Sequence, residues 1–334
     1  MRRVIGIGLV ALDVVIDDGT GERVGAWAGG SCGNVLAILA WLGWDAAPVA
    51  RLDDEHNAQL VREDLRRWKI DERWLSLGHP APAPVFIERL ATHEDGSVTH
   101  RFDRFCPACG GHLPRYQPVA RNALSPVTAS LDGYDVLYID RPSSGAVLLA
   151  RRAREQGLLV VFEPSARGTP AHLAAIASEA DIIKYSAERL TANDREILAA
   201  AAPPLEVETL GPRGLRYRPQ RGAWQTLAPI AVTVDDTAGA GDWTTAGLLL
   251  RLVEHEHPLR RLGADMLRET LSSAQALGAW SCGFRGPRGA MERHTPTEAR
   301  TAADALLDGD GRTERRPRRG AATALLPWAC ESCC

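Results

Sequence analysis

The stretch Asp236-Thr237-Ala238-Gly239-Ala240-Gly241-Asp242 is the most informative part of this 334-residue chain. It follows a β-branched apolar run at residues 230–234 and precedes an apolar helical pattern at residues 243–253, which predicts a strand, a tight turn and a helix. The small residues of the turn allow backbone N–H groups to converge on an anion at the helix N-terminus. Where phosphate binds there, Asp242 is placed to take the proton from an attacking hydroxyl group. The stretch therefore indicates phosphoryl transfer.

A second glycine cluster, Gly29-Gly30-Ser31-Cys32-Gly33-Asn34, opens an apolar helix that is predicted for residues 35–42 and ends at Gly43. Alone, this cluster more often marks a tight turn that caps a helix. Together with residues 236–242, it favours a surface where backbone and Asn34 approach a polyhydroxylated substrate. Asp13 follows the first predicted strand, and its two oxygens could bind substrate hydroxyl groups or simply face solvent.

The chain between the two clusters alternates between apolar strand patterns and amphipathic helix patterns. This alternation predicts a mostly parallel sheet covered by helices on both faces, with ligands at the carboxyl ends of its strands. Residues 85–90 and 98–102 flank an Asp-Gly turn at residues 93–96 and predict a β-hairpin. The further predicted strands are residues 4–7, 136–139, 158–162, 181–184 and 205–210, and the predicted helices are residues 57–68, 144–156, 172–178 and 188–201.

Composition excludes several classes of protein. The net charge of −3 argues against a protein that wraps nucleic acid. No apolar run approaches the roughly 20 residues that span a bilayer, and no signal peptide is evident, so we expect a cytoplasmic protein without a membrane partner. Seven cysteines in a chain of this kind do not suggest a disulfide framework. Neither a P-loop nor a complete dinucleotide-binding glycine pattern is present.

The two glycine-containing stretches together resemble the two signatures of the ribokinase-like (PfkB) family of sugar and nucleoside kinases. The resemblance covers about residues 3–300 and implies a ribokinase-like α/β three-layer sandwich with a mostly parallel central sheet and a small β lid. It implies one kinase domain over residues 1–307, with lid elements at about 10–30 and 85–105. It further implies ATP and Mg²⁺ as cofactors, a small sugar or nucleoside as substrate, and a homodimer formed through the lid.

The resemblance also implies a role for individual residues. Asp242 would be the catalytic base, and residues 238–241 would form the anion hole for the γ-phosphate. The predicted catalytic residues are Asp242, Gly239, Ala240 and Gly241; the predicted substrate-binding residues are Asp13, Gly29, Gly30 and Asn34; and the predicted nucleotide-binding residues are Thr209, Gly211, Gly214, Ala238, Gln275 and Gly286.

One segment departs from the family pattern. Where the family has Asn-x-x-Glu after a strand to organise Mg²⁺, this chain has Ser186 and Arg189, in Lys184-Tyr185-Ser186-Ala187-Glu188-Arg189. Glu188 lies one residue early and is the candidate magnesium residue, or else a solvent-facing acid. A catalytically weak or inactive ligand-binding regulator is therefore the alternative to an ATP-dependent kinase.

A second departure follows the predicted hairpin, in a cysteine-containing insertion at about residues 105–118. Cys106-Pro107-Ala108-Cys109-Gly110 resembles a zinc knuckle, which supplies two of four ligands. Cys330 and Cys333 could complete a zinc site, as could His100 or His112, or the cysteines could be unpaired thiols. Cys32 and Cys282 are expected to be buried.

The chain ends in a segment rich in Arg, Gly and Pro at residues 308–334, which carries the terminal cysteine cluster. This composition predicts a flexible tail. With the insertion, the tail could instead form a surface on which a protein partner docks. The main prediction remains an ATP-dependent kinase that acts on a hydroxyl group of a small sugar or nucleoside.

Overall fold

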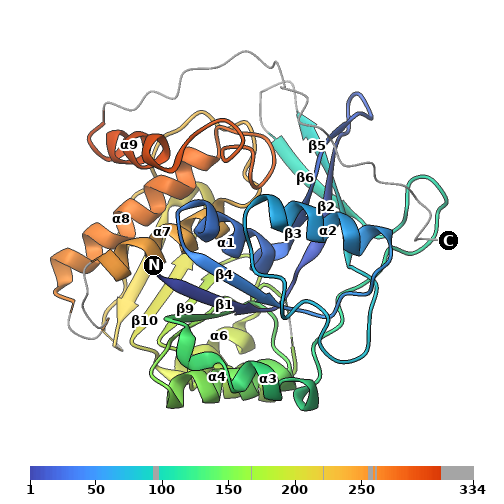
Figure 1. Ribbon diagram of the computed structural model, residues 1–334. Helices are drawn as coiled ribbons and strands as arrows, with labels where there is room; N and C mark the ends of the chain where they lie inside the picture. Colours follow the sequence, from blue (N-terminus) through green and yellow to red (C-terminus); the bar gives the residue numbers. More distant parts are fainter. Residues whose placement is uncertain (93–97, 167, 221, 255–258, 260–261, 310–334) are drawn as a thin grey trace.

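The computed structural model describes residues 1–92, 98–166, 168–220, 222–254, 259 and 262–309. The turn predicted at residues 93–96 and the terminal cysteines Cys330, Cys333 and Cys334 lie outside these ranges. Two β-sheets and the helices that cover the larger one make up the described part of the chain (Figure 1). No helix in these ranges combines the length and apolar character that crossing a membrane requires.

The main sheet contains eight of the described strands, in the order β12-β11-β10-β9-β8-β7-β1-β4. The six strands from β4 to β10 pair in parallel, and β11 and β12 extend that edge antiparallel. The predicted mostly parallel sheet is therefore confirmed. The strands are β1 (Arg3–Ile7), β4 (Asp45–Val49), β7 (Val136–Ile139), β8 (Leu159–Phe162), β9 (Ile182–Ser186), β10 (Leu205–Thr209), β11 (Leu215–Pro219) and β12 (Gln225–Leu227).

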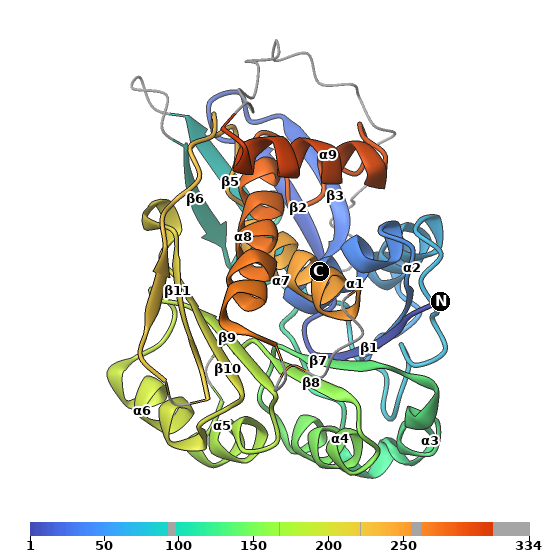
Figure 2. The same cartoon turned by 90° about the vertical axis from the view of Figure 1, so that its left-hand side faces the viewer.

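Helices cover both faces of the main sheet, because its central strands carry apolar side chains on both sides. Val4 and Tyr138 pack into one hydrophobic core, while Ile5 and Leu137 point into another. The three layers are visible in Figure 2. The first face is covered by α1 (Gly30–Trp41), α7 (Ala240–Glu254) and α8 (Ala264–Ser281), with α9 (Pro296–Leu307) and α2 (His56–Arg67) beside them; the second is covered by α3 (Ser125–Thr128), α4 (Ser144–Glu155), α5 (Pro170–Ala177) and α6 (Ala192–Ala201).

The smaller sheet stands at one end of the main sheet (Figure 1). Its order is β3-β2-β5-β6, with β2 (Ala11–Asp17), β3 (Arg23–Gly29), β5 (Val85–Thr92) and β6 (Val98–Asp103). The strands β5 and β6 pair antiparallel, which confirms the predicted hairpin pairing. These four strands fall within the ranges predicted for the lid, and we call them the lid sheet.

One predicted strand is wrong. Residues 230–234 pair with no strand of the described chain, although their β-branched side chains favour an extended backbone. Ile230 and Val232 pack against the core, whereas Val234 is exposed. The run follows β12, the outermost strand of the antiparallel edge, and β-propensity alone does not make a strand without a neighbour. Asp235 and Asp236 instead donate their N–H groups to the carbonyl of Cys282.

Two helix boundaries also differ from the prediction. The helix expected from residue 188 begins at Ala192, because the Thr191 hydroxyl and the Asp194 carboxylate form a capping box. The helix expected from residue 35 begins five residues earlier, at Gly30, and so includes most of the glycine cluster.

Candidate active site

The turn at residues 236–239 is held in a fixed shape by its first carboxylate. Asp236 is fully buried and accepts hydrogen bonds from the N–H of Ala238 (2.8 Å) and the N–H of Gly286 (2.7 Å). Gly239 then has a φ of +74°, and a Cβ there would lie 2.7 Å from the Pro287 Cβ. Only glycine fits this position without strain. The helix α7 begins at the next residue, which places its N-terminal N–H groups at the turn.

Asp242 lies in the first turn of α7 and is buried. The Asn34 Nδ2 donates a hydrogen bond to its Oδ2 at 3.0 Å, across 208 residues of sequence. Burial raises the pKa of Asp242 to about 8, and the neighbouring Glu163 adds to the rise, whereas Lys184, Asn34 and Arg189 oppose it. The structure thus brings the two predicted glycine clusters together at one carboxyl group.

A buried polar network lies beside Asp242. The Lys184 Nζ forms an ion pair with Glu163, which also accepts hydrogen bonds from the hydroxyl groups of Thr245 and Tyr138. Lys184 is 1% exposed. We gave Lys184 no role from the sequence, although a lysine within a buried strand, in a chain with only two lysines, was a signal for one.

Asp13 lies on β2 of the lid sheet and is half-buried, and its contact with a substrate stays a prediction. Its Oδ2 accepts the N–H of Gly30 at 2.8 Å. A Cβ at Gly29 would lie 1.8 Å from the same oxygen, so the glycine leaves room for the carboxylate. Burial raises the pKa of Asp13 to about 7, and Glu88 contributes to the rise while Arg288 opposes it.

Asn34 has an unused acceptor. Its Oδ1 is buried and has no hydrogen-bond partner among the described residues. A buried amide oxygen without a partner carries a free-energy cost that a ligand hydroxyl group can remove. Asn34 therefore holds Asp242 through its nitrogen and offers its oxygen to a second group.

The predicted nucleotide-binding loop follows β10. Thr209 ends the strand, and Gly214 has a φ of +88° with no room for a Cβ, which would lie 2.3 Å from the Leu227 carbonyl oxygen. The N–H of Ala187 donates to the Thr209 carbonyl at 3.0 Å, so residues 186–189 lie beside this loop. The turn Gly211–Arg213 connects Thr209 to Gly214.

Two other predicted nucleotide residues have structural contacts. The Gln275 Nε2 donates to the Ala228 carbonyl at 2.8 Å. Gly286 donates its N–H to Asp236, and a Cβ there would lie 2.6 Å from the Trp27 ring. Contact of either residue with a nucleotide stays a prediction, as does a nucleotide contact by Ala238, whose N–H is engaged by Asp236.

The segment expected to organise a metal ion lies at the end of β9 and contains a single carboxylate. The Ser186 Oγ accepts the N–H of Glu188 at 3.4 Å, and both Glu188 and Arg189 are exposed. Arg189 contributes positive charge close to Asp242 where the family pattern has a carboxylate. An arginine has no acceptor atom for a cation. The segment therefore provides one exposed carboxylate, that of Glu188, whose binding of Mg²⁺ stays a prediction.

The cysteine insertion forms a tight turn. The N–H of Cys106 donates to the Gly111 carbonyl, and the N–H of Gly111 lies 3.4 Å from the Cys109 Sγ. Cys106 is buried and Cys109 exposed. In the described ranges no third cysteine, histidine or acidic residue joins this pair, so neither His100 nor His112 completes it. Because Cys330 and Cys333 lie outside those ranges, the zinc site stays a prediction. Cys32 and Cys282 are buried, as expected.

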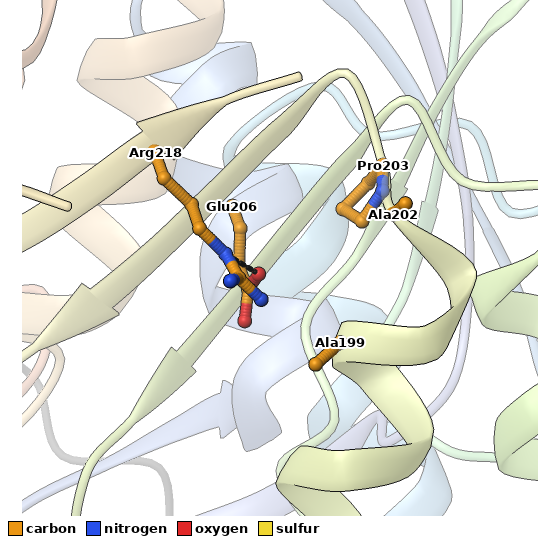
Figure 3. A pocket seen from close by; sticks show the side chains of 5 residues that line it. All are labelled: Ala199, Ala202, Pro203, Glu206 and Arg218. Atoms are coloured by element: carbon orange, nitrogen blue, oxygen red, sulfur yellow. Dashed lines mark hydrogen bonds and ion pairs between the residues drawn. The ribbon is translucent and has the colours of Figure 1, made fainter. Parts of the chain in front are cut away.

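A separate pocket of about 260 Å³ lies at the other end of β10 (Figure 3). Ala199, Ala202 and Pro203 line it together with Glu206 and Arg218, whose carboxylate and guanidinium pair at 2.6 Å. Because Glu206 lies near the amino end of the strand and Thr209 at its carboxyl end, this pocket is not the predicted site.

A family model and curated relatives both match this chain over most of the fold described above. The family model described as "pfkB family carbohydrate kinase" matches residues 115–293. The chain is 27% identical over 290 residues to aminoimidazole riboside kinase from Salmonella typhimurium, covering 79% of this chain and 84% of that protein. It is 27% identical over 304 residues to fructokinase from Klebsiella pneumoniae, covering 84% and 94% respectively.

Solved structures show the same fold. The structure superposes on aminoimidazole riboside kinase from Salmonella enterica, complexed with aminoimidazole riboside and an ATP analogue, with a TM-score of 0.64 and 22% identity, covering 90% of this chain and 99% of that one. For fructokinase with bound ATP from Xylella fastidiosa, the TM-score is 0.69 at 17% identity, covering 92% and 98%. The ribokinase-like α/β fold with a small lid sheet is thereby confirmed.

Proposed function

Because the chain belongs to the pfkB family of carbohydrate kinases, which transfer phosphate to an alcohol group, we propose that it phosphorylates a hydroxyl group of a small sugar or nucleoside with ATP. The observation that carries this proposal is the position of Asn34 between the two halves of the site. Its nitrogen holds Asp242 at 3.0 Å, and its buried oxygen is without a partner among the described residues. A substrate hydroxyl group that donates to this oxygen is close to the proposed base.

Asp242 takes the proton from the attacking hydroxyl group in this proposal. A carboxylate whose pKa is raised to about 8 is a stronger base, once ionised, than an ordinary aspartate. The deprotonated oxygen attacks the γ-phosphorus, the bond to the β-phosphate oxygen breaks, and ADP leaves. The N–H groups of Gly239 and Gly241 offset the charge on the transferring phosphoryl group at the start of α7. Ala240 lies between them, and its N–H donates to the Thr237 carbonyl at 3.3 Å.

The other ligand contacts are assigned by position. Asp13, Gly29 and Gly30 bind the substrate from the lid side, since Asp13 lies on β2 and the glycines join β3 to α1. Thr209, Gly211 and Gly214 bind the nucleotide at the carboxyl end of β10. We assign no step to a metal ion, because Ser186 and Arg189 replace the residues that would organise it.

The relatives suggest the substrate class. One acts on a riboside and another is a fructokinase, so ketohexoses and ribosides are the first candidates for this chain.

The predicted homodimer through the lid also stays a prediction. Phe102 and Phe105, at the end of the lid hairpin, are 58% and 52% exposed, and such side chains are frequent at interfaces.

The substitution Asp242→Asn tests the proposed base. Phosphorylation of a panel of ketohexoses and ribosides with ATP should identify a substrate for the wild-type protein. With that substrate, Asp242→Asn should lower kcat by about 10²–10⁴-fold, the usual contribution of a general base. The exposed Asp54→Asn variant should keep wild-type kcat. An Asp242→Asn variant with undiminished turnover would show that another group takes the proton.

A ligand-binding regulator without turnover is the second candidate, and the replacement of the metal-organising carboxylate by Arg189 favours it. The same panel separates the two. Heat released on sugar binding without any phosphorylated product would identify a regulator, whereas formation of sugar phosphate and ADP in equal amounts identifies the kinase.

A further inference from the structure

One histidine joins the lid sheet to the turn that precedes α7. His100 lies on β6, diagonally across from Glu88 on β5 and on the same face of the lid sheet. Its Nδ1 pairs with the Glu88 Oε1, while its Nε2 lies 3.1 Å from the Thr237 Oγ1 and 3.4 Å from the Asp236 Oδ1. The imidazole ring therefore bridges the lid and the first two residues of the 236–242 stretch.

The two carboxylates on either side of the ring are buried. Glu88 is 6% exposed and Asp236 fully buried, while the His100 side chain is 18% exposed. Two buried negative groups that face opposite nitrogens stabilise a positive ring. The hydrogen bond to Glu88 and the charge of Asp236 raise the pKa of His100 above its ordinary value of 6.5, against the opposing effect of burial.

The arrangement suits a proton better than a metal ion. Glu88, His100 and Asp236 are close enough together to be considered as metal ligands. However, each ring nitrogen faces a different carboxylate, and an ion can bind only one of the two nitrogens. A protonated histidine donates from both nitrogens, which matches the observed geometry.

Asp236 connects this bridge to the proposed phosphate site. Its two oxygens also accept the N–H groups of Ala238 and Gly286, which fix the turn before Gly239. A contact that positions Asp236 therefore positions the start of α7. We propose that the His100 imidazolium is a positioning residue, which clamps the lid onto residues 236–237 and thereby sets the anion-binding turn for phosphoryl transfer. This inference rests on the proposed kinase function.

The sign of the pH effect follows from the charge of the ring. The clamp is complete when His100 is protonated, and it weakens as the pH rises through the raised pKa of His100. Asp242 has the opposite effect, because the proposed base gains activity as it ionises near pH 8. Other charged or titratable groups lie near the clamp. On the Glu88 side, Asp13 interacts with Glu88 and with Arg288. On the Asp236 side, the Cys282 thiol interacts with Asp236.

The test compares the full-length wild-type protein with His100→Gln and with His112→Gln. His112 is exposed and lies in the cysteine insertion, where it stacks on Phe105, so its replacement should leave activity unchanged. At pH 6.5, His100→Gln should lower kcat about 10-fold or more, the size expected for one charge-assisted hydrogen bond. The decline of wild-type kcat at alkaline pH should be absent from the His100→Gln profile.

An NMR titration of the His100 ring tests the inference independently of kinase activity. The His100 ring proton signal in the NMR spectrum, assigned as the one missing from His100→Gln, should titrate above pH 6.5, and Glu88→Gln should lower that pKa. A His100 that titrates at or below 6.5, or an alkaline limb unchanged in His100→Gln, would overturn the clamp. Stoichiometric binding of Zn²⁺ or Mn²⁺ by the wild-type protein that is lost in His100→Gln would overturn it in favour of a metal site. The NMR result would stand even if the chain proved not to be a kinase.

Discussion

Asp242 shows at the scale of one residue how function and stability compete. A carboxyl group that is buried beside Glu163 costs free energy when it ionises, and this cost is the reason its pKa rises to about 8. The same burial excludes water from the proposed base. Asp242 can act as the proposed base only when it is ionised. The ionised form is also the one that lowers the stability of the folded protein.

The Asp242→Asn variant should accordingly be more stable than the wild-type protein at high pH. The pKa is raised in the folded state, so the contribution of Asp242 to stability is fully present below pH 3.8 and is lost as the pH rises to about 8. We expect the variant to melt about 5 °C higher at pH 8 and to match the wild-type protein near pH 4. Thermal unfolding followed by circular dichroism at several pH values measures this difference.

The exposed Asp54→Asn variant is the control, and its melting temperature should follow that of the wild-type protein at every pH. If Asp242→Asn melts at or below the wild-type temperature across the whole range, the Asp242 carboxyl group is not strained by burial.

Individual side chains were predictable only in part. The proximity of Asn34 and Asp242 followed from matching two sequence patterns. The Lys184–Glu163 ion pair could not be predicted, because it depends on which strands become neighbours in the sheet. No local sequence pattern determines that order. The contact of His100 with Asp236 was missed for the same reason, because it joins a strand of the lid sheet to the turn before α7.

The turn before α7 decides the site at the scale of an element. Gly239 combines a φ of +74° with close contact to Pro287, whereas Gly157 has a similar φ of +79° and no atom within 4 Å of the position that a Cβ would occupy. The two glycines therefore form a matched pair that separates backbone strain from crowding.

We expect Gly239→Ala to shift the turn and to lower kcat by about 10²-fold or more, the loss typical of one misplaced donor for developing charge. Gly157→Ala should cost about 1–2 kcal/mol of stability from its positive φ and leave kcat unchanged. Steady-state kinetics and chemical unfolding of both variants provide the comparison. Equal effects of the two substitutions on kcat would mean that the shape of the 236–239 turn does not matter for transfer.

Elements were easier to predict than side chains, with one instructive exception. The central strands β1, β7 and β8 are buried on both faces, so each produces a continuous apolar run that the sequence displays directly. Residues 230–234 are also rich in β-branched side chains but pair with no strand of the described chain. Composition reports the preference of the backbone, and the presence of a neighbouring strand decides whether a strand forms.

At the scale of the whole molecule, the proposed site takes residues from the lid sheet, such as Asp13 on β2, and from the elements of the main sheet, such as Asp242 on α7. Ligand binding should therefore stabilise the molecule as a unit. The Asp242→Asn variant, which should bind without turnover, suits a thermal-shift survey of sugars and nucleosides in the presence of ATP. A true substrate at about 100 times its Kd should stabilise the protein by about 2.7 kcal/mol, whereas stereoisomers of it should have smaller effects. A panel in which no compound raises the melting temperature would contradict the assignment to this substrate class.

The sequence separation of 208 between Asn34 and Asp242 has a consequence for the synthesis of the protein. The helices that carry them, α1 and α7, pack against each other, yet α7 is synthesised only after about three quarters of these 334 residues. Contacts of such long range form late in folding. A nascent chain therefore exposes the apolar face of α1 throughout most of its synthesis. A chaperone that binds apolar surface would act during this interval.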